Sequence, residues 1–117
     1  MKSFLFIISF LGFSTTQAAE LLAGCNGNGV TIKILRDGSI TTAHLNQEKI
    51  ARPVQRIKTH PVFVKYQGLN FDLQINGNCK TGAGLCGYVD LGNEKFAVAC
   101  SVGIDVNKLY FDNQYSN

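Results

Sequence analysis

The sequence lacks an apolar run long enough to cross a membrane as a helix. Its leading apolar run, residues 4–13, covers ten positions, whereas a helix needs about 20 residues to cross roughly 30 Å of hydrocarbon. Lys2 precedes this run, and residues 16–18 (TQA) place small side chains at the −3 and −1 positions of a cleavage site. This arrangement is typical of a secretory signal peptide. We therefore expect cleavage of residues 1–18, leaving residues 19–117 as a single disulfide-stabilised β domain.

Motifs that carry common enzyme chemistry are also missing. There is no G-x-S-x-G nucleophile motif and no C-x-x-C or H-x-x-x-H spacing, and His44 and His60 are the only histidines. Paired cysteines would leave no thiolate to act as a nucleophile. Residues 82–87 spell G-x-G-x-x-G, but a strand-like pattern follows them, whereas a dinucleotide fingerprint requires a helix. We therefore expect no enzymatic activity, no metal site and no cofactor.

Residues 21–25 (LLAGC) lie just behind the leader and admit two interpretations. They match a bacterial lipobox, in which Cys25 would carry lipid, or they form the first strand of the mature domain, in which Cys25 would form a disulfide. Residues 14–20 separate this motif from the apolar run, and Glu20 would place a carboxylate in an apolar environment at a high cost in free energy. We favour the disulfide and keep the lipid anchor as the alternative.

Four cysteines remain after the leader is removed, and an even number in an exported chain indicates a disulfide framework. Cys79 and Cys86 flank a short glycine-rich loop, so we favour Cys79–Cys86 together with Cys25–Cys100. The main alternative is Cys25–Cys79 with Cys86–Cys100. The framework and the leader predict a periplasmic or secreted protein. The mature chain has no N-x-S/T sequon, which favours a bacterial source.

The mature region alternates apolar and polar residues with the period of β-strands. Residues 30–45 show this alternation on both sides of Asp37-Gly38, a favoured two-residue hairpin turn. Residues 46–53 have weak helical character, which Pro53 limits to a turn or two. Further short strands are predicted as follows: residues 54–58, 62–66, 71–75, 88–91, 95–102 and 106–111, with a polar, frayed tail after them.

The predicted fold class is all-β. We expect a small antiparallel sandwich or closed barrel of about eight short strands, tied by two disulfides, because many short strands with closely spaced turn signals are typical of these folds. No internal repeat and no linker is visible in the sequence.

Charge is distributed unevenly along the chain. Residues 49–71 contain no acidic residue, although half of the ten mature basic residues lie there. Such a segment could contact an anionic protein, glycan or lipid surface. We expect no nucleic-acid partner, because the net charge is small and the chain is expected to be exported. We expect the contacts to come from this basic segment and the glycine-rich loop: Arg52, Arg56, Lys58, His60, Lys65, Gly82 and Gly84.

The resulting hypothesis is a non-catalytic binding or inhibitory module of the bacterial envelope. A small hydrolase is the first alternative, since scattered carboxylates such as Asp72 and Asp90, or a carboxylate and His44, could converge in the fold as an acid–base pair. A structural envelope protein that self-associates is the second alternative. The oligomeric state and the identity of the partner do not follow from the sequence.

Overall fold

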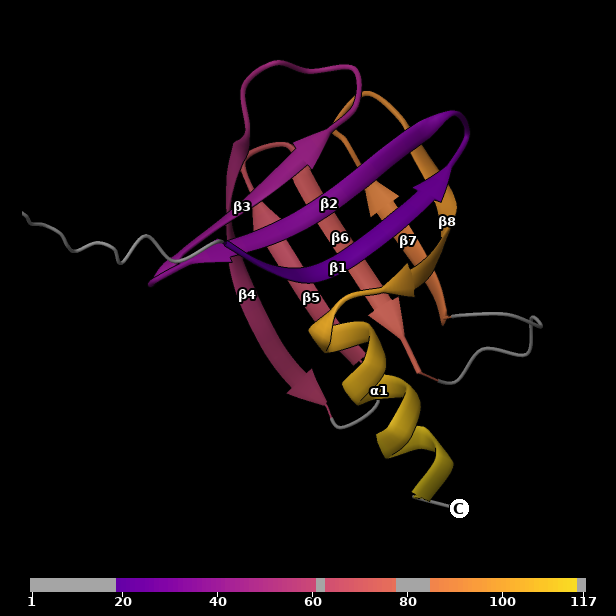
Figure 1. Ribbon diagram of the computed structural model, residues 1–117. Coiled ribbons are helices and arrows are strands. Elements are labelled where there is room, and N and C mark those ends of the chain that lie inside the picture. Colours follow the sequence, from indigo (N-terminus) through magenta and orange to yellow (C-terminus); the bar gives the residue numbers. More distant parts are fainter. Residues whose placement is uncertain (1–18, 61–62, 78–84, 116–117) are drawn as a thin grey trace, which may run out of the picture.

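The computed structural model describes residues 19–60, 63–77 and 85–115, and these form an eight-stranded antiparallel barrel followed by one helix (Figure 1). Each strand pairs with the next one along the chain, and the last pairs with the first, so the barrel is closed. The prediction of an all-β fold is confirmed, with the barrel rather than the sandwich as its form. The elements are β1 (Glu20–Gly27), β2 (Val30–Asp37), β3 (Ile40–Leu45), β4 (Arg52–His60), β5 (Phe63–Gly68), β6 (Phe71–Asn76), β7 (Leu85–Asp90), β8 (Lys95–Val102) and α1 (Ile104–Tyr115).

The predicted hairpin over residues 30–45 is confirmed as β2 and β3. Asp37 pairs with Ile40, so the two-residue connection is Gly38-Ser39, one position later than predicted. Gly38 has a φ of 64°, which glycine adopts without steric cost, and glycine at the first turn position is typical of a type II′ hairpin. The turn chemistry therefore sets the register that places Ile32 and Ile34 inside the barrel.

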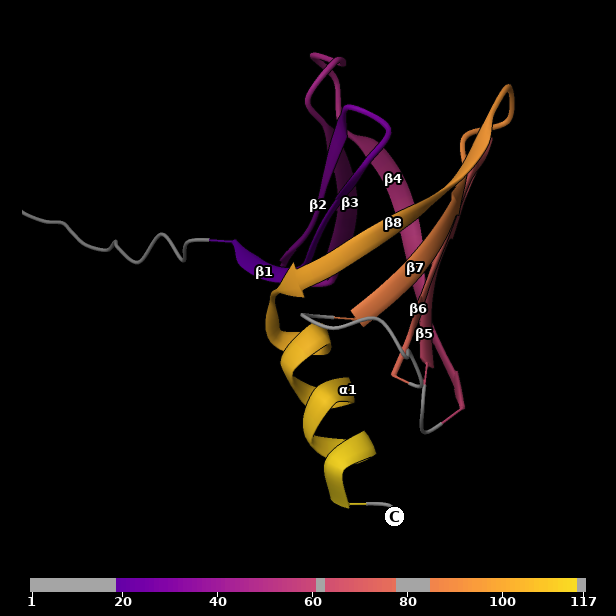
Figure 2. The same ribbon diagram turned by 90° about the vertical axis from the view of Figure 1, so that its right-hand side faces the viewer.

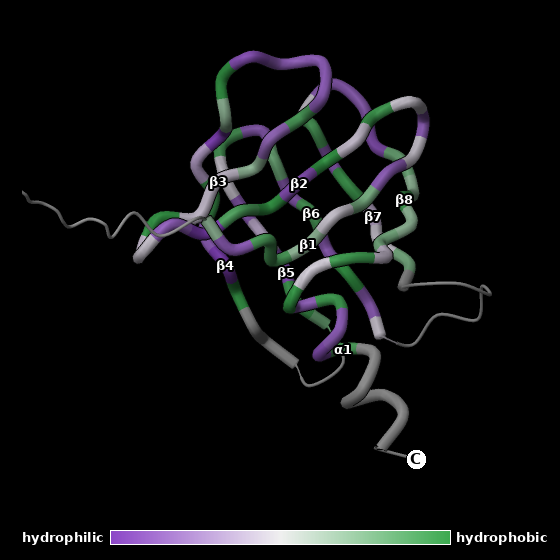
Figure 3. Tube along the Cα trace, in the orientation of Figure 1, coloured by the Kyte–Doolittle hydropathy of each residue, from purple (hydrophilic) through white to green (hydrophobic). Residues whose placement is uncertain are grey.

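The barrel interior is filled by apolar side chains from all parts of its wall. Tyr66 is the largest side chain that is fully buried, and Leu73, Ile75 and Val89 are equally inaccessible. Hydrophobic positions follow the strands, while hydrophilic ones gather in the connections (Figure 3). This filling is expected because a barrel of about eight strands has an interior just wide enough for its own side chains.

Cys25 and Cys100 form a disulfide across the seam where β1 meets β8. The two residues are direct cross-strand partners with a Cα–Cα distance of 4.0 Å, and both are buried. This confirms the favoured pairing for these cysteines and excludes the alternative set. Because Sγ of Cys25 is bonded to Cys100, it is not free to carry lipid, and a disulfide is typical of oxidising compartments.

The second predicted disulfide lies partly outside the described residues. Cys86 is in β7, and no described cysteine is free, but Cys79 belongs to the undescribed segment 78–84. The Cys79–Cys86 bridge therefore stays a prediction. Leu85–Asp90 forms a strand, so the helix that a dinucleotide fingerprint would need after residues 82–87 does not follow them.

The prediction of a last strand over residues 106–111 and a frayed tail is wrong. These residues belong to α1, which packs against β1 and β8 and closes one end of the barrel (Figure 2). Gly103 has a φ of 120° and ends β8, and a Cβ there would lie 2.4 Å from the carbonyl oxygen of Leu22. After this break, Val106 and Leu109 share one helix face and are buried. In so short a segment, the spacing of apolar residues does not distinguish a helix from a strand.

Two further expectations need correction around β4. The weak helical character of residues 46–53 produces no helix, since residues 46–51 form the connection to β4 and Pro53 lies within that strand. The predicted strand over residues 54–58 is part of a longer one, β4 (Arg52–His60), which extends beyond it at both ends. No helix in the described residues is long and apolar enough to cross a membrane.

Candidate functional site

The two ends of the barrel differ, and we name them for what lies there. The helix end is the end that α1 covers (Figure 2). The opposite end carries only the connections between paired strands, and we call it the loop end (Figure 1). The loop end is formed by residues 28–29, 46–51, 69–70 and 91–94.

The strand register does not bring the side chains of the basic segment to one face. Arg56 is the direct partner of Tyr66, whose side chain fills the interior, so Arg56 is on the inward face of β4. Arg52 has the same parity along the strand. Lys65 pairs with Ile57 and is therefore on the outward face. Arg52 and Arg56 therefore lie on the inward face of the barrel wall, whereas Lys65 lies on the outward face.

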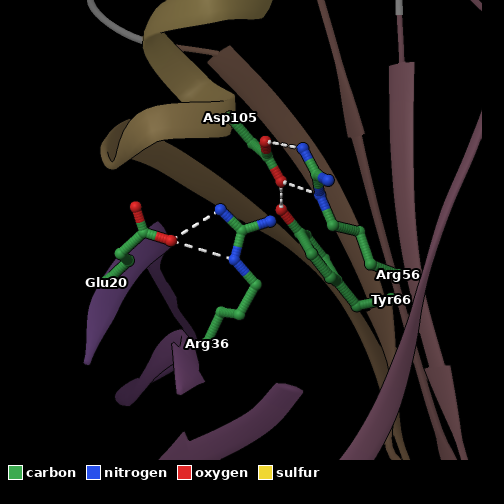
Figure 4. Close-up of polar contacts among 5 residues, drawn as sticks. All are labelled: Glu20, Arg36, Arg56, Tyr66 and Asp105. Atoms are coloured by element: carbon green, nitrogen blue, oxygen red, sulfur yellow. Dashed lines mark hydrogen bonds and ion pairs between the residues drawn. The ribbon is translucent and has the colours of Figure 1, made fainter. Parts of the chain in front are cut away.

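Arg56 is held by a buried carboxylate at the helix end (Figure 4). Its Nε donates to Oδ2 of Asp105 at 2.8 Å, and its Nη2 donates to Oδ1 at 2.5 Å. The hydroxyl of Tyr66 also donates to Oδ2 of Asp105. The Asp105 side chain is 3% exposed, and it lies in the first turn of α1, where the helix dipole favours a negative charge. This cluster therefore joins β4, β5 and α1.

The environment shifts the pKa values of both partners of Asp105 in the direction that preserves the cluster. Burial, followed by the hydrogen bond to Asp105, raises the pKa of the Tyr66 phenol. The hydrogen bond to Asp105 is the main cause that raises the pKa of Arg56. Tyr66 is therefore held as a neutral donor, Arg56 as a cation, and the carboxylate accepts from both.

The other two arginines are engaged in the same way. Arg36 donates from Nε and Nη2 to Oε1 of Glu20 (Figure 4). Arg52 donates to both carboxylate oxygens of Glu48 and, through Nη1, to the carbonyl of Asn70 at 2.8 Å. The hydrogen bond from Arg52 lowers the pKa of Glu48. All three arginines of the sequence are thus bound to carboxylates of the chain itself.

The remaining predicted contact residues are less fully described. Lys65 forms an ion pair with Asp72 across β5 and β6, with 3.8 Å between Nζ and Oδ2. Lys58 and His60 belong to β4, but their side chains lie outside the described part of the chain, as do Gly82 and Gly84. A binding role for these residues stays a prediction.

Exposed apolar side chains mark the loop end as a different candidate surface. Ile50 in the β3–β4 connection is 83% exposed, and Leu69 in the β5–β6 turn is 88% exposed. They line one open depression, of about 660 Å³, together with Arg52, Asn70 and Asn93. Exposed Lys49 adjoins Ile50, and no described acidic side chain forms an ion pair with it. No sequence pattern indicates that Ile50 and Leu69 lie near each other, because only the closure of the barrel brings their connections together.

The residues of the hydrolase alternative are partly brought together. Asp72 on β6 and Asp90 on β7 are direct cross-strand partners on the outside of the barrel. His44 lies on β3 and shares a hydrogen bond of 3.0 Å with the hydroxyl of Thr42, apart from both carboxylates. Among the described residues, no group of three or more histidine, cysteine, aspartate or glutamate side chains is arranged to hold a metal ion.

Comparison with family models, curated proteins and solved structures finds no match in any of the three.

A pH-dependent effect follows from the buried phenol of Tyr66. Above pH 10.0, its ordinary pKa, the unfolded chain releases a proton that the folded protein retains. The free energy of unfolding should therefore fall by about 1.4 kcal/mol per pH unit from Tyr66 alone. Tyr66→Phe removes this contribution, so its stability should fall less steeply between about pH 10 and 11. Urea unfolding across this range measures both slopes. Equal slopes for the wild type and Tyr66→Phe would contradict the assignment.

Proposed function

We propose that the protein is an exported, non-catalytic binding module of the bacterial envelope that contacts a partner protein through its loop end. The observation that carries this proposal is the exposure of Ile50 and Leu69 in one depression at the end of the barrel that α1 leaves uncovered. Exposed apolar side chains rimmed by polar groups are typical of protein-binding sites. The rim is supplied here by Lys49, Asn70 and Asn93.

The organisation of the barrel supports a binding role at its surface. The interior is packed with its own side chains, and the strands form a rigid scaffold that holds short connections in place. Binding residues are concentrated on such loops because they are accessible and are positioned by the rigid elements that they join. The proposed contact surface therefore requires no opening of the barrel.

The proposed surface overlaps the acid-free segment of residues 49–71. Lys49, Ile50, Arg52 and Leu69 all belong to the acid-free segment 49–71, but it is the two aliphatic side chains and Lys49 that are free to contact a partner. Arg52 is bound to Glu48 and Asn70. An acidic group beside an apolar area on the partner would complement this arrangement.

The test compares partner capture by wild type and by Ile50→Ser/Leu69→Ser. We expect the double variant to fold normally, because both side chains are exposed, and to lose capture of its partner from an envelope extract about tenfold or more. Lys49→Glu should reduce capture less than the double variant does. Its effect should be larger at low salt, where charges are screened less.

Ile40→Ser is the matched control for this experiment. Ile40 is 64% exposed and adjoins the β2–β3 turn, at the barrel end opposite the β3–β4 connection. It should keep wild-type capture. Equal capture by the wild type and the Ile50→Ser/Leu69→Ser variant would refute the proposed surface, as would equal losses in the double variant and the control.

A further inference from the structure

A second surface lies on the outer wall of the barrel, beside the loop end. Strands β5 to β8 present two cross-strand rows of outward side chains there. The first row joins Asp72 to Asp90, and the second joins Gln74 to Tyr88. A shallow depression of about 310 Å³ runs over both rows. Its lining residues, which we call the outer-wall site, are Lys65, Asp72, Gln74, Tyr88, Asp90 and Lys95.

Tyr88 presents an aromatic ring at the centre of this wall. The residue is 51% exposed, although an aromatic side chain of this size usually gains free energy by burial. Its partner on β8 is Ala97, which is exposed, and exposed Ala99 is next on that face. Such small side chains leave the flank of the Tyr88 ring accessible from β8. The ring is thus available to a ligand with an apolar face.

The polar groups beside Tyr88 form two loose ion pairs. Lys65 Nζ lies 3.8 Å from Asp72 Oδ2, and Lys95 Nζ lies 3.8 Å from Asp90 Oδ2. These separations exceed a direct hydrogen bond, so each ammonium and carboxylate keeps hydrogen-bonding capacity for a hydroxyl group that approaches the pair from solvent, although Asp72 Oδ2 also accepts from Nε2 of Gln67. One hydroxyl can then accept from the lysine and donate to the aspartate at the same time. Two such positions occur side by side, because Asp72 and Asp90 are direct partners.

From this juxtaposition we propose that the outer-wall site binds a neutral oligosaccharide of hexopyranose units. A sugar ring offers an apolar C–H face for Tyr88 and adjacent hydroxyl groups for the two lysine–aspartate pairs. Two cations and two anions give the site no net charge, which matches a neutral ligand better than a charged one. The amide of Gln74 adds a further donor and acceptor. This site shares no residue with the loop-end depression and does not depend on the proposed function.

The experiment is an NMR titration of the full mature chain with chitotriose, cellotriose and maltotriose as probes. We expect at least one of them to bind with a Kd of about 1 mM or tighter, with the largest shift changes at residues of the outer-wall site. Tyr88→Ala should weaken this binding about tenfold or more, whereas Tyr88→Phe, which keeps the ring, should bind like wild type. Asp72→Asn/Asp90→Asn should weaken it to a similar extent.

Ile50→Ser/Leu69→Ser is the control and should bind the probes as wild type does, since its altered residues lie at the loop end. Its result separates this site from the proposed protein-binding surface. The absence of binding by all three probes would overturn the proposal, as would binding that Tyr88→Ala leaves unchanged. Dimerisation that Tyr88→Ala abolishes would instead assign the wall to a second copy of the chain. Recovery of cleaved probe would overturn a purely binding role and support the hydrolase alternative.

Discussion

Replacing both Cys25 and Cys100 with alanine should lower the free energy of unfolding by about 4.5 kcal/mol. The two residues are 75 positions apart, and closing a loop of this length restricts the unfolded chain by that amount in the loop-entropy model. Small domains have only about 5–15 kcal/mol of stability in total, so the variant should lie close to the folding threshold. Urea unfolding of the two proteins measures the difference.

The position of this disulfide explains why its effect should be large. It bonds neighbouring residues of β1 and β8, the strands whose pairing closes the barrel. Ala99→Ser alters an exposed neighbour on β8 and is the matched control, with an expected change within about 0.5 kcal/mol. An unfolding midpoint for the double alanine variant equal to that of wild type would show that the bridge does not restrain the unfolded chain.

Removing the carboxylate of Asp105 should have the second largest effect. Asp105→Ala leaves Arg56 and the Tyr66 hydroxyl without their common acceptor in a buried position. Breaking a buried ion pair by removing one partner costs about 3–5 kcal/mol. The loss should also loosen α1 at the helix end, because Asp105 hydrogen-bonds the helix to β4 and β5. Hydrogen exchange of the α1 amides would detect this loosening.

A double-mutant cycle separates the pair from the rest of the packing. Arg56→Met/Asp105→Ala removes both charges, and its loss should be smaller than the sum of the two single losses. Asp37→Ala, at an exposed position of the β2–β3 turn, should change stability by no more than about 0.5 kcal/mol. Additive losses in the cycle would contradict a direct interaction between Arg56 and Asp105.

Features that depend on local sequence could be predicted, and the β2–β3 hairpin is the clearest example. Alternation fixed which side chains point inward, and Gly38 supplied the turn conformation. The Cys25–Cys100 pairing was favoured because Cys79 and Cys86 flank a short loop, which leaves the other two cysteines to pair with each other. Strand alternation, a glycine turn and the spacing of cysteines are all visible in the sequence, so they predict structure before the fold is known.

The identity of α1 could not be read from the same kind of signal. Val106 and Leu109 fit one face of a helix, but six residues of mixed polarity also fit a short strand. The decisive features are tertiary: the backbone of Gly103 passes against Leu22, and Asp105 reaches Arg56, 49 positions away. A pair at this separation depends on how the barrel closes.

The basic segment shows why linear charge was a poor guide to the surface. Arg52 and Arg56 were grouped with Lys65 because residues 49–71 contain no acid. Each of them is paired with an acid from outside the segment: Arg52 with Glu48, Arg56 with Asp105 of α1, and Lys65 with Asp72 of β6. The side chains left for contact at the loop end, Ile50 and Leu69, are 19 positions apart and meet only across neighbouring connections.

The most direct measurement of the loop-end proposal is site-specific photo-crosslinking in the producing cell. A photoreactive phenylalanine analogue placed at position 50 or 69 should crosslink the same partner protein, because both positions line one depression. The same analogue at position 40, at the opposite end of the barrel from position 50, should give no such product. Crosslinking to one common partner from positions 50 and 69 alone is the predicted result. Crosslinking from position 40 with equal yield, or none from 50 and 69, would contradict it.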